Sequence, residues 1–136
     1  MYMPRAEWNT SEDMQFTTDY EPYGGRKSYA EECAGGFYAA RLGILQKMEE
    51  LKRQGSVLVI RVITGEYAVP LGVWVVREAV RKALSARPIV FGSRELMLRY
   101  VQQLITKRFG FSIDPVLGRS RLLRDLKRQT KLTSFV

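Results

Sequence analysis

Histidine is absent from this 136-residue chain, and cysteine occurs once, at Cys33. A lone cysteine forms no internal disulfide, and without histidine the chain has neither a Cys/His zinc finger nor an imidazole general base. Phosphate loops of the G-x-x-x-x-G-K-[ST] type, G-x-G-x-x-G motifs and G-x-S-x-G nucleophile elbows are also missing. The sequence therefore excludes much familiar catalytic chemistry, and it indicates no cofactor and no metal site.

Long hydrophobic runs are missing as well. No apolar stretch approaches the ~18 residues of a membrane span. The N-terminal segment is acidic and polar, where a signal peptide would be basic and then apolar. We therefore expect a cytoplasmic protein without a membrane partner, and a length that suits a single domain with one hydrophobic core.

Acidic residues that could hold a magnesium ion occur in the N-terminal part, but their spacing matches no two-metal motif. They are Asp13, Asp19, Glu21, Glu31 and Glu32. A solvated acidic face is the simpler interpretation, and a metal-dependent nuclease is an alternative.

Positive charge, by contrast, is abundant and unevenly distributed. The chain has 22 Lys and Arg against 14 Asp and Glu, a net charge of +8, and residues 1–50 carry −4 whereas residues 51–136 carry +12. Such an excess favours anionic partners, nucleic acid above all. We expect DNA phosphates to be bound by the basic C-terminal segment Arg119, Arg121, Arg124, Lys127, Arg128 and Lys131. Solvated surface charge is the alternative.

Apolar periodicity predicts the secondary structure. A 3.6-residue period predicts helices over 29–54, 72–86, 93–109 and 117–128. β-Branched, nearly unbroken apolar runs predict strands over 56–63 and 89–91. Together these elements predict an α/β or α+β domain, in which a small mixed sheet with one βαβ unit is covered by about four helices.

The chain is expected to have three parts. Prolines, glycines and acidic residues mixed with aromatics over 1–28 indicate an irregular N-terminal arm. The α/β body then occupies 29–128, and 129–136 form a separate tail.

Arg61 interrupts the apolar run and needs a carboxylate partner, which we expect to be Glu78 or Glu66. Ligands favour the C-terminal edge of such a βαβ unit. With the turn glycines 65 and 72, a small anion or nucleotide pocket is predicted there from Arg61, Glu66, Tyr67, Trp74, Arg77 and Glu78. A buried ion-pair network that anchors the crossover is the alternative, and a nucleotide-processing enzyme would use the same residues.

The tail fits the pattern Q-x-x-[aliphatic]-x-x-[aromatic]-[aromatic], apart from its last position. The pattern resembles the peptide by which DNA-processing proteins bind the sliding clamp, PCNA. In a 3₁₀ turn residues i and i+3 eclipse, so Leu132 and Phe135 would form one apolar plug beside Gln129. The predicted clamp-binding residues are Gln129, Leu132, Phe135 and Val136. A tail folded back on its own core is the alternative.

Two further stretches carry a family resemblance. Residues 36–45 (GFYAARLGIL) and 68–78 (AVPLGVWVVRE), followed by the tail, resemble the C-terminal domain of the archaeal Nre family of DNA-repair proteins. The resemblance covers roughly 28–136 and implies an accessory role in repair of DNA damage, on chromosomal DNA and coupled to the clamp. It implies no catalytic residue.

Members of that family also have a large N-terminal domain with a cysteine-rich, zinc-finger-like segment. We therefore expect this chain to be a piece of a longer protein or a short relative. A pure protein-interaction domain, whose charge serves only solubility, is the remaining alternative.

Overall fold

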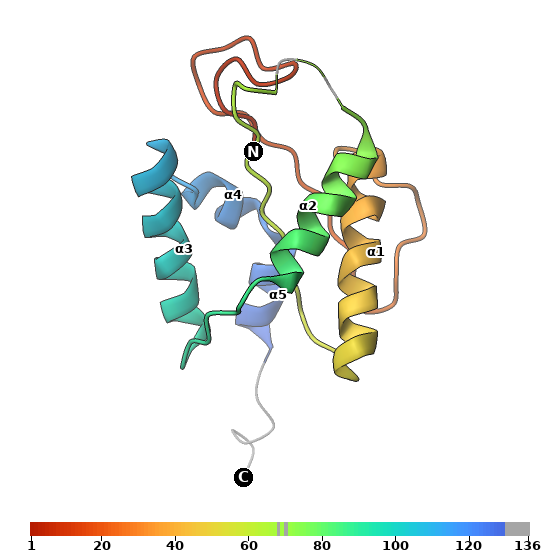
Figure 1. Cartoon of the computed structure of the whole chain (residues 1–136). Helices are drawn as coiled ribbons and strands as arrows, with labels where there is room; N and C mark the ends of the chain where they lie inside the picture. The colour runs from red at the N-terminus through yellow and green to blue at the C-terminus, as the bar shows by residue number, and fades with distance from the viewer. Residues whose placement is uncertain (68, 70, 130–136) are drawn as a thin grey trace. The chain divides into compact units, whose positions relative to one another are not determined.

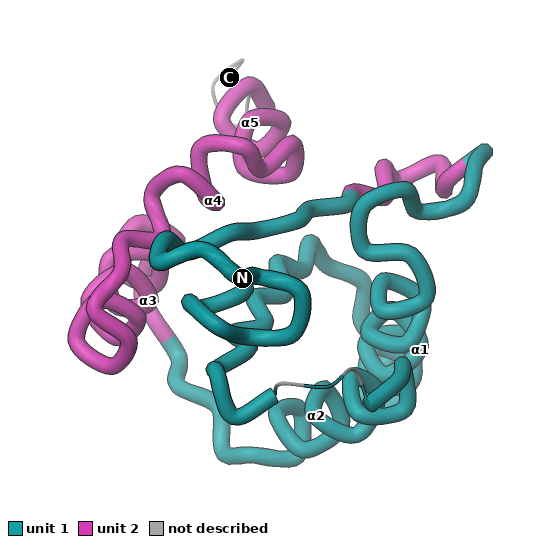
Figure 2. The backbone as a smooth tube through the Cα atoms, turned by 90° about the horizontal axis from the view of Figure 1, so that it is seen from above, with its two compact units in different colours: residues 1–19, 27–90 teal, residues 20–26, 91–136 magenta. Residues whose placement is uncertain are grey.

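The computed structural model describes residues 1–67, 69 and 71–129, and helices are the only extended regular elements in this part of the chain (Figure 1). They are α1 (Ala34–Leu51), α2 (Val73–Ser85), α3 (Arg94–Phe109), α4 (Asp114–Arg119) and α5 (Arg121–Arg128). The chain divides into two compact units, where the sequence predicted a single core. Unit 1 comprises residues 1–19 and 27–90, and unit 2 comprises 20–26 with the chain from Phe91 onward (Figure 2).

Unit 1 is built on the packing of α1 against α2. Glycines of α1 lie opposite valines of α2: a methyl group at Gly43 would lie 3.0 Å from Cγ1 of Val80, and one at Gly35 would lie 2.9 Å from Cγ1 of Val73. Because glycine has no side chain, the valines approach the α1 backbone closely. The glycines that lower helix propensity are therefore the residues that let the two helices pack.

Helix α1 begins at Ala34, later than the sequence predicted. Oδ2 of Asp19 accepts hydrogen bonds from the backbone N–H groups of Glu32 and Cys33, at 3.1 and 2.7 Å. These bonds hold the segment before the helix in a bend. At the other end, Lys52 adopts the left-handed conformation (φ 52°) and terminates the helix.

The predicted sheet is wrong: in the described residues, strand pairing is limited to isolated bridges from Tyr2 to Gln15 and to Ile63. The end of the run 56–63 is bonded to the N-terminus: Ile63 makes backbone bonds with Met1 and Met3, and the Arg61 carbonyl accepts from the N-terminal amine of Met1 at 2.8 Å. A run covered on both faces would be buried, whereas Val59 is 45% exposed. β-Branched residues favour extended backbone, but a sheet also needs neighbouring strands to satisfy its N–H and C=O groups.

Residues 89–91 also form no strand, and Val90 is 88% exposed. The βαβ unit is therefore not formed. By contrast, the helices predicted over 29–54, 72–86 and 93–109 are confirmed, with ends shifted by a few residues.

Unit 2 contains α3, α4 and α5 around the buried side chains of Ile105 and Ile113. Ser93 caps α3 by accepting a hydrogen bond from the N–H of Leu96, and Gly110 ends it in the left-handed conformation. The single helix predicted over 117–128 is divided at Ser120, because the hydroxyl of this residue caps α5 by accepting from Leu123 N–H. In the part of the chain that is described, no helix has the length and apolarity that a bilayer crossing requires.

Candidate functional site

One face of α5 carries the most concentrated positive charge of unit 2. Arg121, Arg124 and Arg128 recur every three or four residues, so their side chains project from the same side of the helix. Together with Asp125 of that helix, and with Tyr20 and Pro22 from the 20–26 segment, they line a pocket of about 380 Å³. The structure thus brings half of the predicted basic segment into one site.

Tyr20 contributes an aromatic side chain to the lining of this pocket. Its phenol Oη donates a hydrogen bond to Oδ2 of Asp125 at 2.8 Å, although the two residues are 105 positions apart. This bond to the carboxylate is the main reason why the pKa of Tyr20 is raised above its ordinary value. The Tyr20 carbonyl also accepts from Nη1 of Arg26 at 2.7 Å. Tyr20 is therefore fixed through its backbone and through its side chain.

The pocket has an excess of positive charge. Three guanidinium groups and one carboxylate line it, which leaves two positive charges uncompensated. Among the described residues, no ion pair neutralises Arg121, Arg124 or Arg128, and all three are exposed. Guanidinium groups that are not paired with carboxylates are available for a bidentate interaction with an external anion.

The other members of the predicted basic segment lie elsewhere. Arg119 is the last residue of α4 and is exposed, and Lys127 is exposed on α5 without lining the pocket. Lys131 lies outside the described residues, as do Leu132, Phe135 and Val136 of the predicted clamp-binding tail. Gln129 is described: it follows α5 as its C-cap and is exposed.

Arg61 does have a carboxylate partner, but the expected partners, Glu78 and Glu66, were wrong. Its Nη2 lies 3.7 Å from Oε1 of Glu7, whose side chain is 13% exposed. The backbone N–H of Glu7 donates to the Tyr67 carbonyl at 2.6 Å and holds this segment against the 61–67 region. The partner comes from the N-terminal arm, which sequence spacing does not connect to Arg61.

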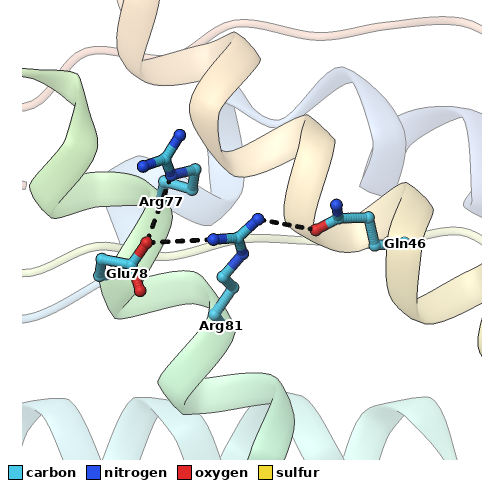
Figure 3. A network of polar contacts seen from close by, with 4 residues as sticks. All are labelled: Gln46, Arg77, Glu78 and Arg81. Atoms are coloured by element: carbon cyan, nitrogen blue, oxygen red, sulfur yellow. Dashed lines mark hydrogen bonds and ion pairs between the residues drawn. The ribbon is translucent and has the colours of Figure 1, made fainter.

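Glu78 instead belongs to a polar network on α2, which also contains Arg77 (Figure 3). Its Oε1 lies 3.3 Å from Nε of Arg77 and 3.2 Å from Nη1 of Arg81, and Nη2 of Arg81 donates to Oε1 of Gln46 on α1 at 3.3 Å. All four side chains lie at the surface, where such pairs contribute little stability.

Among the described residues, no hydrogen bond or ion pair joins Arg61 to the side chains of the other residues predicted to form a pocket in unit 1. Trp74 is 58% exposed near the start of α2, Glu66 is exposed, and Tyr67 is half-buried. Arg61 and the Arg77–Glu78 pair have different ionic partners.

Two of the five acidic residues named in the N-terminal part, Asp19 and Glu32, form hydrogen bonds to the backbone through their carboxylates. Asp19 holds the segment before α1, and Oε2 of Glu32 accepts from the backbone N–H of Thr18 at 2.8 Å. Over the described ranges there is no group of three or more Cys, Asp or Glu side chains arranged to hold a metal ion.

Sequence reasoning missed Tyr20 and Pro22 as members of the arginine-lined pocket. In the sequence, these residues are an aromatic and a proline in an irregular segment, and nothing there predicts a contact with α5. Folding brings the two segments together within unit 2.

Comparison with known proteins supplies an independent line of information. The family model described as archaeal Nre, C-terminal, matches residues 21–135. DNA repair protein NreA of Archaeoglobus fulgidus is 44% identical over 135 residues, which cover 99% of this chain and 31% of the relative. DNA repair protein NreA of Haloferax volcanii is 42% identical over 82 residues, 59% of this chain and 20% of the relative.

DNA repair protein NreB of Archaeoglobus fulgidus is 33% identical over 102 residues, 75% of this chain and 26% of the relative. This chain therefore spans less than a third of the length of these relatives. No solved structure matches it. The family resemblance inferred from residues 36–45, 68–78 and the tail is confirmed, and the chain belongs to the archaeal Nre, C-terminal, family.

Proposed function

We propose that this chain is the part of an archaeal DNA-repair protein that contacts DNA through α5 and attaches to the sliding clamp through residues 129–136. The repair role is supported by the relatives, which are named DNA repair proteins. The observation that carries the DNA contact is the convergence of Arg121, Arg124 and Arg128 on one face of a single helix.

This arrangement suits phosphate binding for two reasons. Guanidinium groups bind phosphate oxygens bidentately, and an exposed helix face carries several of them at fixed spacing along the nucleic acid. The nearby Lys127, also exposed, adds charge without lining the pocket. Contacts of this kind give affinity and position without sequence preference.

The clamp contact is supported by the sequence pattern from Gln129 to Phe135. Gln129 directly follows the last helical residue of α5, so the docking peptide would begin where the basic helix ends. A protein held on the clamp by this peptide would carry α5 close to the attachment point.

The salt dependence of duplex DNA binding tests the DNA contact. The affinity should fall with salt, with a log–log slope of about −0.9 for each phosphate contacted. Replacing both Arg124 and Arg128 by alanine should make this slope shallower by about 1.8, which is the contribution of two phosphate contacts. The matched control removes two positive charges from exposed residues of unit 1, Lys82 and Arg87, and should leave the slope unchanged.

Four outcomes would count against this proposal. Salt-independent binding, or no binding, would favour the protein-interaction alternative. Equal slopes for the α5 double variant and its control would show that the arginines face a protein or solvent. Magnesium-dependent cleavage of the duplex in the same samples would favour the nuclease alternative.

A further inference from the structure

We infer that the arginine-lined pocket of unit 2 recognises the phosphomonoester at the end of a DNA strand. The inference rests on the proposed DNA contact and deepens it by naming the chemical group that enters the pocket. It depends on three properties of the pocket: its size, its charge and its aromatic wall.

The first argument is size and shape. At about 380 Å³, the pocket is near the lower end of the range of about 300–1,000 Å³ for small-ligand sites. Tyr20 and Pro22, from the 20–26 segment, line it together with residues of α5. A phosphate inside a continuous backbone has a nucleotide on both sides and suits an open groove, whereas a terminal phosphate has one free side and suits a concave site of this size.

The second argument is charge. The three arginines and Asp125 leave an excess of two positive charges in the pocket. A phosphomonoester carries about −1.5 to −2 charges near pH 7, because its second pKa is about 6. An internal phosphodiester carries a single negative charge. The pocket charge therefore matches the terminal group better than the internal one, and three guanidinium groups can contact its three peripheral oxygens.

The third argument is the aromatic wall. Nucleobases stack on aromatic rings with little dependence on their identity. The Tyr20 ring is held by the bond from its hydroxyl to Asp125 and by the bond from Arg26 to its carbonyl. A ring that is already fixed loses little conformational entropy when a terminal base stacks on it. The same hydroxyl donates a hydrogen bond to one carboxylate oxygen of Asp125, and this bond reduces the repulsion between that carboxylate and an entering phosphate.

The test uses the full chain and one fluorescent single-stranded oligonucleotide in three forms, with a 5′-phosphate, a 3′-phosphate or hydroxyls at both ends. Internal phosphates are identical in the three forms, so any difference reports the terminal group alone. We expect at least one phosphorylated form to bind about tenfold more tightly than the hydroxyl form, a difference of about 1.4 kcal/mol.

Variants locate the effect. Arg124→Ala should abolish the preference for a phosphorylated end, and Arg124→Lys, which keeps the charge but loses the bidentate fork, should lose most of it. The matched control Lys127→Ala, on the same helix but outside the pocket, should weaken binding to all three oligonucleotides equally. Both positions are exposed, and circular dichroism verifies that the variants keep the helical fold.

The possible failures are distinguishable. Equal affinity of the unmodified chain for all three oligonucleotides overturns this inference and leaves the proposed DNA contact intact. Absence of binding to all three oligonucleotides overturns this inference, and absence of duplex binding as well overturns the proposed DNA contact. A competition assay with a free deoxynucleoside monophosphate distinguishes a strand end from a free nucleotide. If the free nucleotide abolishes the preference for phosphorylated ends at a concentration similar to that of the oligonucleotide, the ligand is a free nucleotide, and the assignment to a strand end is overturned.

Discussion

The thiol of Cys33 lies 3.6 Å from Oγ1 of Thr17 and is half-buried just before α1. Burial raises the pKa of this thiol above its ordinary value of 9.0, and the carboxylates of Asp19 and Glu32 raise it further, against an opposing hydrogen bond with Thr17. The folded chain therefore keeps the Cys33 proton more firmly than the unfolded chain does.

This difference links stability to pH. A pKa raised by folding means that the full stability is present below the unfolded pKa, near 9.0, and is lost as the pH rises through the folded value. We expect the free energy of unfolding of the native sequence to fall, relative to that of Cys33→Ala, as the pH rises above the unfolded pKa of 9.0. Urea titrations of both proteins measure the difference, and other titrating groups cancel between them. If the free energies of unfolding of the two proteins change with pH in parallel, the Cys33 thiol is not shielded from water by folding.

At the scale of elements, the contact of α1 with α2 depends on glycines of α1, which have no side chain at the contact. Gly43 is buried, and a methyl group there would lie 3.0 Å from Cγ1 and 3.7 Å from Cβ of Val80. Valine is stiff at χ1 and cannot easily turn away. Alanine at this position gains about 1 kcal/mol of helix propensity and loses about 1–3 kcal/mol to overpacking.

Gly36 provides the matched control, because a methyl group there would lie 3.9 Å from Cγ2 of Val76, an ordinary contact distance. Both changes replace glycine by alanine within α1, so we expect Gly43→Ala to be less stable than Gly36→Ala by about 1–3 kcal/mol. Denaturant unfolding measures this difference. Adding Val80→Ala should relieve the crowding and make Gly43→Ala less destabilising. If the effects of the two substitutions are instead additive in a double-mutant cycle, Gly43 and Val80 do not interact.

At the scale of the whole molecule, clamp attachment is a prediction about residues 129–136. Burying Leu132 and Phe135 should contribute about 1.5–3 kcal/mol each, and ordering the peptide removes a few kcal/mol. We expect a dissociation constant on the order of micromolar, near −8 kcal/mol.

Calorimetry with an archaeal sliding clamp tests this prediction. Phe135→Ala should abolish binding because it removes one of the two apolar anchors, and Val136→Phe should tighten binding because it restores the second aromatic of the pattern. If the native sequence and both variants bind with equal affinity, the tail belongs to the core of this chain, and clamp recruitment loses its support.

Local sequence information was sufficient for the positions of α1, α2 and α3 and for the family. Apolar residues at helical spacing, Ser93 as a cap and Gly110 as a terminator determine α3 through interactions within a few residues of each other. Arg121, Arg124 and Arg128 share one face of α5 because residues three or four positions apart lie on the same side of a helix. The family could be inferred because its signature consists of contiguous stretches of sequence.

Other features were decided only by tertiary structure, because they join residues that are distant in the chain. The run 56–63 has strand propensity, but Tyr2 alone forms a bridge with it, at Ile63, and no sheet follows in the described residues. Arg61 required a carboxylate, and the fold supplies Glu7. Tyr20 reaches Asp125 across 105 positions. Periodicity determines which face of an element is apolar or charged, whereas the partner of that face depends on which distant segments fold against it.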